Sequence, residues 1–198
     1  MRQRLAQEAA QILMESGNRD FYAAKRKAAE HLDAVDTRNM PSNSEIEEAL
    51  MTYQRIFRAD SQPKVLRKLR QVAVQAMRFF VDFRPRLVGS VLRGTADIHS
   101  RVTLHVFAHT PEEVDMFLFH HAIPFETAEK RVRYGGESTV TVPVYRFLAE
   151  ETPVEVVVFP LDGPHHPPLS PVDGKPMRRA DLARVEKLLQ QECEGKQS

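Results

Sequence analysis

The chain has 198 residues, of which 42% are hydrophobic and 28% are charged, and its formal net charge is +1. This composition suffices for one sizeable globular core or two small ones, and it argues against intrinsic disorder. The near-zero net charge excludes a globally basic protein, so any attraction for nucleic acid or phosphate must come from local clusters.

Cysteine usage and the N-terminus indicate a compartment. The single cysteine, Cys193, has no partner for an internal disulfide, which fits a reducing environment. The N-terminal segment carries charged residues throughout and no long apolar run, so we expect neither a signal peptide nor a membrane span. We therefore expect a soluble, cytoplasmic protein that makes no membrane contact.

Apolar residues recur at helical spacing through the first 83 residues. The pattern predicts four helices, at roughly 3–15, 20–32, 43–58 and 63–82. The third has a start signal, because Ser42 or Ser44 can cap it and acidic residues follow in the first turn. Pro85 stops the fourth helix.

Beyond Pro85, short β-branched runs alternate with turn residues. They predict strands at 87–91, 102–108, 131–134, 139–147 and 154–159. Helices are expected at 111–122 and at 180–192, and Gly135-Gly136 is expected to form a hairpin turn. The segment 160–176 is too rich in proline and glycine for either element and predicts a loop or a linker.

This order of elements predicts an α+β fold with three regions. An N-terminal helical region at 1–83 is followed by a small mixed β-sheet with flanking helices at 84–160. The Pro-rich loop and the C-terminal helix, at 161–198, are expected to pack on that core.

One stretch, GSVLRGTADIHSRVT, leads from the end of a predicted strand through a turn into the next strand. It resembles the signature of the nucleotidyltransferase fold of the DNA polymerase β superfamily. In that family a Gly-Ser turn holds the nucleotide phosphates, an Asp-x-Asp pair on the next strand binds two divalent metals, and a later strand supplies a third carboxylate. The resemblance covers residues 84–159 and implies a sheet of nucleotidyltransferase type.

The first half of this signature is retained. Gly89 and Ser90 match the phosphate turn, and Arg93 begins the Arg-Gly-Thr-Ala continuation. The resemblance implies that Gly89, Ser90 and Arg93, together with Arg101, bind the phosphates of a nucleotide.

The metal-binding half is largely lost. Arg101 and Thr103 occupy the two aspartate positions, and only Glu155, in PVEVVVF, stands at a carboxylate position. Two-metal catalysis needs closely placed oxygen ligands around both ions, whereas Arg101 brings a positive charge to that place. We therefore expect no metal cofactor, and Glu155 is the single candidate catalytic residue.

Other interpretations of these residues remain open. GSVLRG can be a simple tight turn before a strand. Asp97 and His99 can replace the missing ligands and hold Mg²⁺ or Mn²⁺ together with Glu155, or they can be solvated or cap the turn. Glu155 can also form a structural ion pair with Arg101.

Two main function classes follow. The first is a nucleotidyltransferase-like protein without ordinary two-metal catalysis, a pseudoenzyme that binds a nucleotide, RNA or a protein partner. The second is an active nucleotidyltransferase with a non-standard metal site built from Glu155, Asp97 and His99. A third is a purely structural partner of another protein. Basic runs in the fourth helix and at 130–133 are candidates for RNA phosphates, although such runs are usually solvated surface.

Overall fold

The computed structural model describes residues 1–16, 20–34, 39–57, 61–135 and 138–194. The chain forms two compact units. The first contains Met1–Val65 with the short segments Asp97–His99 and Pro171–Gly174, and the second contains the rest. The predicted helical region ran through residue 83, whereas the units divide after Val65 and place most of the fourth helix in the second unit.

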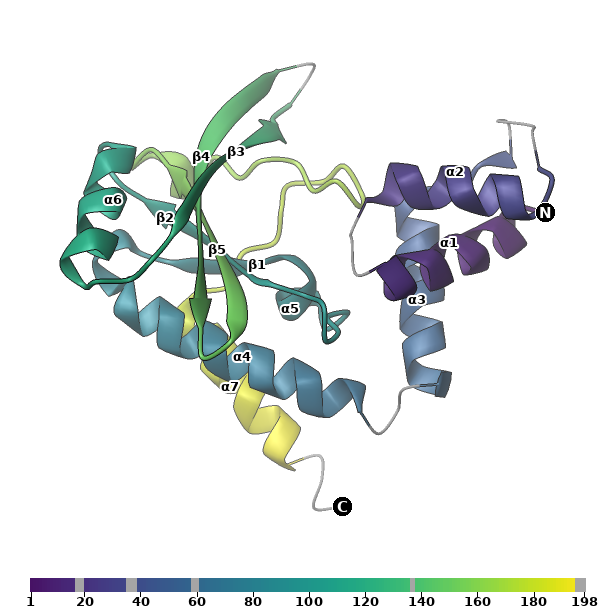
Figure 1. The fold of residues 1–198 in the computed structure, drawn as a ribbon, viewed down its shortest axis with the longest axis horizontal. Coiled ribbons are helices and arrows are strands. Elements are labelled where there is room, and N and C mark those ends of the chain that lie inside the picture. The colour runs from purple at the N-terminus through teal and green to yellow at the C-terminus, as the bar shows by residue number, and fades with distance from the viewer. Residues whose placement is uncertain (17–19, 35–38, 58–60, 136–137, 195–198) are drawn as a thin grey trace. The chain divides into compact units, whose positions relative to one another are not determined.

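The first unit is built on three helices, α1 (Arg2–Ser16), α2 (Phe21–His31) and α3 (Asn43–Phe57) (Figure 1). Their apolar faces meet in one core, which includes Leu5, Leu13 and Ile46. Helix α3 begins at the predicted cap: the backbone N–H of Ser42 donates to Glu45 Oε2 at 2.7 Å, and the N–H of Glu45 donates to Ser42 Oγ at 3.2 Å. This reciprocal capping satisfies donors that a helix start leaves unpaired.

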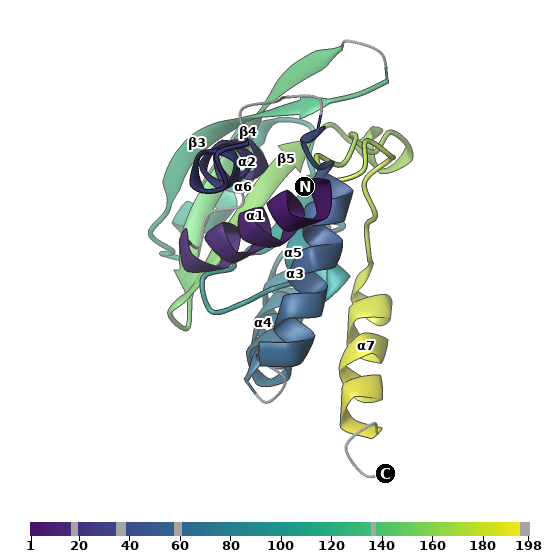
Figure 2. The ribbon, with the colours of Figure 1, turned by 90° about the vertical axis from the view of Figure 1, so that its right-hand side faces the viewer.

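The second unit is built on a five-stranded mixed sheet with the order β1-β2-β5-β4-β3. The strands are β1 (Arg86–Val88), β2 (Val102–Phe107), β3 (Glu126–Arg133), β4 (Thr139–Ala149) and β5 (Thr152–Phe159). Only β2 and β5 pair in parallel, and the other neighbours are antiparallel. Strands β3 and β4 form a long twisted ribbon (Figure 2). Of the predicted Gly135-Gly136 turn between them, Gly136 lies outside the described residues. The predicted α+β class is confirmed.

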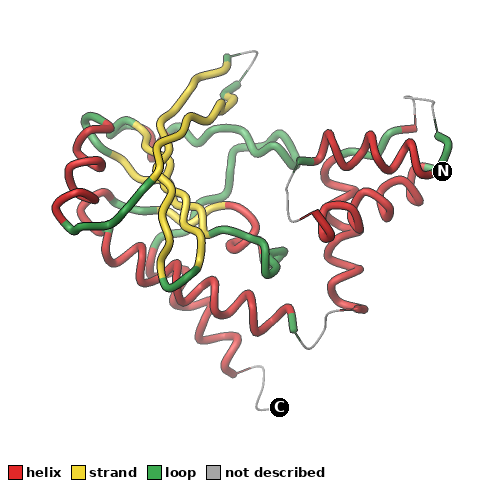
Figure 3. Tube along the Cα trace, in the orientation of Figure 1, coloured by secondary structure: helices red, strands yellow, loops and turns green. Residues whose placement is uncertain are grey.

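The predicted strand over 87–91 is wrong after Val88. At that point the chain enters a five-residue helix, α5 (Gly89–Arg93), which Figure 3 shows as a short turn of helix beside β1. Gly89 adopts a φ of +77° and Gly94 a φ of +85°. Both values lie in the left-handed region that favours glycine, so these two glycines separate α5 from the strand before it and the loop after it.

Helices cover one face of the sheet. The ring of Phe80, which follows α4 (Gln62–Phe79), lies 6.0 Å from the ring of Phe147 on β4 and 5.5 Å from that of Phe117 on α6 (Pro111–His120). Helix α7 (Leu182–Glu194) runs beside α4, and Arg78 Nη2 lies 2.7 Å from Glu186 Oε1. No helix among the described residues is long and apolar enough to cross a membrane.

The predicted loop, 160–176, begins with a short 3₁₀ helix, Gly163–His165. A Cβ atom added at Gly163 would lie 3.0 Å from Phe107 Cε1 and 3.0 Å from Phe159 Cβ, both in a buried cluster on the other face of the sheet. A larger residue at position 163 would therefore force Phe107 or Phe159 to shift by a few tenths of an ångström.

We expect Gly163→Ala to lower the free energy of unfolding by about 1–3 kcal/mol, because the added methyl group overpacks two buried aromatic residues. Gly135→Ala is the matched control, since a Cβ atom there would meet nothing within 4 Å. Urea unfolding of both variants measures the difference. Equal stability of the two variants would contradict the packing argument.

Candidate functional site

The Gly-Ser turn lies directly beside Thr103, which stands at the second of the two positions where the signature has aspartate. Val88 pairs with Thr103 across β1 and β2, and a Cβ atom added at Gly89 would lie 4.0 Å from both Cβ and Oγ1 of Thr103. Ser90 follows in the first turn of α5 and is partly exposed. The structure therefore brings Gly89, Ser90 and Thr103 to one place.

The far end of α5 is held by a buried arginine of α4. The backbone N–H groups of Gly94 and Thr95 both donate to the carbonyl of Ser90, at 2.9 and 3.0 Å. Arg70 Nε donates to the carbonyl of Val91 at 3.2 Å, and its guanidinium forms an ion pair with Glu192 of α7. Because these bonds satisfy carbonyls that a helix end leaves unpaired, α5 and the Gly-Ser turn have a defined position. The basic run in α4 thus includes a structural arginine.

Glu155 lies beside the same turn. It is the register partner of Thr103 in the parallel pair β2 and β5, so the two side chains leave the sheet on one face at neighbouring positions. The Glu155 side chain is 4% exposed. A buried carboxylate requires partners, because an isolated buried charge is strongly unfavourable.

Three cations supply those partners. Lys130 Nζ lies 2.8 Å from Glu155 Oε1, while Arg101 Nη1 and Arg146 Nε each lie 3.1 Å from Oε2. The ion pair with Arg101 that the sequence suggested is therefore present. The three cationic side chains are 44–50% exposed. We call these four residues the Glu155 cluster.

The cluster keeps the carboxylate ionised. Burial alone would raise the pKa of Glu155, but the charges and hydrogen bonds of Lys130, followed by Arg101 and Arg146, outweigh it and hold the pKa below its ordinary value. One negative charge faces three positive charges, so two positive charges remain uncompensated within the cluster.

Sequence reasoning placed Lys130 in a basic run and missed Arg146. Both reach Glu155 through strand register: Arg146 pairs with Glu155 across β4 and β5, and Lys130 comes from the next strand, β3. Alternation along β3 places Lys130 on the face of Glu155 and Arg131 on the opposite face. The signal is therefore present in the sequence, but it is readable only once the strand order is known.

Arg93, Asp97 and His99 are the other residues predicted for the site. Arg93 is the last residue of α5, at the end opposite Gly89. Asp97 is buried and accepts a hydrogen bond from the backbone N–H of His99 at 3.0 Å, while the His99 side chain is exposed. Both belong to the segment grouped with the first unit. Within the described part of the chain, no group of three or more His, Cys, Asp or Glu side chains can hold a metal ion.

A second polar contact on the face of Glu155 was not predicted. His105 of β2 is buried, and Arg179 Nε donates to its Nδ1 at 3.1 Å. Burial, followed by the charges of Arg179 and Lys130, lowers the pKa of His105 well below its ordinary value. Arg179 also donates to the carbonyl of Gly163 at 2.6 Å. The neutral histidine and this arginine thus tie the segment before α7 to the sheet.

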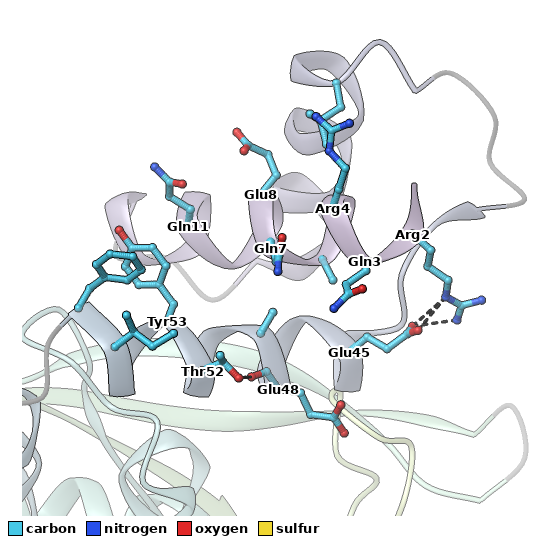
Figure 4. Close-up of a pocket in the computed structure, with 15 residues that line it drawn as sticks. Arg2, Gln3, Arg4, Gln7, Glu8, Gln11, Glu45, Glu48, Thr52 and Tyr53 are labelled. Carbon is cyan, nitrogen blue, oxygen red and sulfur yellow. Dashed lines mark hydrogen bonds and ion pairs between the residues drawn. The ribbon is translucent and has the colours of Figure 1, made fainter.

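A groove of about 900 Å³ lies in the first unit, between α1 and α3 (Figure 4). Its lining includes the ion pair of Arg2 with Glu45, at 2.8 Å, and the side chains of Tyr53 and Phe57. None of the site residues predicted from the sequence lines it. The groove is therefore a feature separate from the Glu155 cluster.

No protein-family model, no curated protein and no solved structure matches this chain. A functional assignment must therefore be argued from the residues of the chain itself. The residues that carry chemistry and that the fold brings together are the Gly-Ser turn, Thr103 and the Glu155 cluster.

Proposed function

We propose that the protein is nucleotidyltransferase-like with a degenerate metal site and does not carry out ordinary two-metal catalysis. Its ligand is a nucleotide, an RNA or a protein partner. One observation carries this proposal. Glu155 is the only carboxylate at the three positions where the family has metal ligands, and three cationic side chains form ion pairs with it.

The arrangement of the elements supports the family part of the proposal. A strand leads into a Gly-Ser turn and a short helix, the next strand lies antiparallel to it, and a later strand that carries Glu155 lies parallel beside the second. The family pattern requires that the turn, the strand with the aspartate pair and the strand with the third carboxylate be neighbours. Here Gly89, Thr103 and Glu155 are neighbours in that order.

Electrostatics support the loss of metal catalysis. Each pair of like unit charges at 4 Å costs about 4 kcal/mol at an effective dielectric constant of 20, and a divalent ion doubles the charge. An ion beside Glu155 would meet Arg101, Lys130 and Arg146 around a single carboxylate. Mg²⁺ needs several oxygen ligands in octahedral geometry, so the cluster favours an anion instead.

Calorimetric titration with nucleoside triphosphates, once in EDTA and once in Mg²⁺ or Mn²⁺, tests the proposal. We expect binding in EDTA that is equal to or tighter than binding with the metal present, because metal-bound triphosphate carries less negative charge. Binding that requires a divalent ion, together with transfer of a nucleotidyl group to an acceptor, would contradict it and would favour an active enzyme.

A further inference from the structure

We propose that Arg101, Lys130 and Arg146 form a metal-independent site for the polyphosphate chain of a nucleoside triphosphate, with Glu155 as the buried anchor that positions them. This inference rests on the proposed function and names both the ligand class and the residues that bind it. Two of the three cations, Lys130 and Arg146, stand outside the signature that the sequence presents.

The first step in the argument is charge. Glu155 compensates one of the three positive charges, so the cluster attracts an anion with more than one negative charge. The phosphate chain of a triphosphate carries several charges within a few bonds. Each phosphate of an RNA strand carries one charge and is separated from the next by a ribose, so an RNA strand presents fewer charges to a cluster gathered around one carboxylate.

The second step is the supply of donors. Arginine has five N–H donors and the lysine ammonium has three, and the contacts to Glu155 use Nη1 of Arg101, Nζ of Lys130 and Nε of Arg146. These side chains are 44–50% exposed, whereas the carboxylate beneath them is 4% exposed. An anion from solvent therefore meets the cations before it meets Glu155. Hydrogen bonds from such cations to phosphate oxygens are charge-assisted and strong.

The third step is preorganisation. Long cationic side chains lose rotamer freedom when they bind a ligand, and this loss weakens binding. Here the cations come from β3, from β4 and from the residue before β2, and one buried acceptor already holds all three. A ligand therefore finds the donors gathered in place.

Substitutions on a single strand test the site. Lys130→Met removes a charge on the cluster face, whereas Arg131→Met removes an equal charge from the next residue of the same exposed strand, on the opposite face. Titration with ATP in EDTA should show about a tenfold or greater loss of affinity for Lys130→Met, the loss expected for one charge-assisted hydrogen bond. Arg131→Met should change the affinity by less than about twofold, because an exposed charge outside the site acts only through screened electrostatics.

Two further variants guard against loss of fold. Arg146→Met should weaken ATP binding as Lys130→Met does, and Lys130→Arg should restore most of the affinity because it keeps the charge. Thermal unfolding of each variant confirms that the chain is folded. Inorganic tripolyphosphate, which lacks a base, should bind with the same dependence on Lys130.

The outcomes separate this site from the proposed function. If the natural chain binds ATP in EDTA but Lys130→Met and Arg131→Met lose the same affinity, the site is wrong while metal-independent nucleotide binding stands. If the natural chain binds neither ATP nor tripolyphosphate, the proposed ligand class is wrong. Tighter binding of a single-stranded RNA than of ATP, with the same dependence on Lys130, would overturn the triphosphate in favour of RNA.

Discussion

Replacing Glu155 by alanine is expected to lower the free energy of unfolding by about 2–3 kcal/mol, somewhat less than the cost of leaving a fully buried charge without its partner. The carboxylate is 4% exposed and holds three cations, so its removal leaves three positive charges facing one another. The loss is moderated because these cations are about half exposed and water can solvate them. Urea unfolding at neutral pH measures the change.

The matched control is Glu129→Ala, which removes an exposed carboxylate from β3. We expect it to change the free energy of unfolding by less than about 0.5 kcal/mol, as surface substitutions usually do. Equal losses in the two variants would show that Glu155 contributes no more than an ordinary surface charge.

The stabilisation by Glu155 also has a defined pH dependence. Its pKa is lowered in the folded protein, so its contribution is fully present above the pKa of the unfolded chain, about 4.3, and is lost as the pH falls through the folded pKa. The isosteric variant Glu155→Gln should therefore be less stable than the natural chain at pH 7. This difference should shrink as the pH falls through the lowered pKa of folded Glu155, where the natural side chain becomes protonated.

Local signals in the sequence predicted most of the helices. Helix α3 begins where Ser42 and Glu45 predicted a cap, because capping depends on residues that are three positions apart. Strand β3 was predicted over 131–134 only and actually begins at Glu126. Its side chains are mostly exposed, so it lacks the apolar alternation by which a half-buried strand is recognised.

The error at residues 89–91 has a different cause. Val91 is β-branched, which favoured a strand. The positive φ of Gly89 turns the chain at that point, and Arg70, far away in sequence, holds the carbonyls of the resulting helix. A long-range contact therefore overrides the local preference.

The residues of the candidate site also fall into two groups, those that local sequence patterns mark and those that only the fold brings to the site. Arg101 and Glu155 were recognised because a signature and a strand pattern mark their positions, and their ion pair is present. Lys130 and Arg146 act through the register of the β3–β4–β5 pairs. Register depends on the whole sheet, since a slip of one residue would send both side chains to the opposite face.

The second large effect that we expect is a gain of affinity for divalent metal ions when the missing carboxylates are restored. The cations of the Glu155 cluster determine which substitutions this gain requires. Arg101→Asp with Thr103→Asp places carboxylates at the two missing positions beside Glu155. In the natural chain Lys130 contacts Oε1 of Glu155 and Arg146 contacts Oε2, and the double variant changes neither cation. Because both oxygens keep a cationic partner, we expect the double variant to gain little affinity for Mn²⁺ or Mg²⁺.

Adding Lys130→Ser and Arg146→Ser should free the Glu155 carboxylate and bring three anionic ligands together. We expect this quadruple variant to bind Mn²⁺ at least about tenfold more tightly than the natural chain, because hard divalent ions are held by several carboxylate oxygens. Calorimetric titration with Mn²⁺ measures the gain.

The control variant carries asparagine in place of each introduced aspartate, together with the same two serines. Asparagine keeps the shape of aspartate without its charge, so this control variant should show no gain in Mn²⁺ affinity. If the quadruple variant is folded and binds no more Mn²⁺ than its asparagine counterpart, then positions 101, 103 and 155 do not converge as a metal site requires, and the degenerate-site interpretation fails.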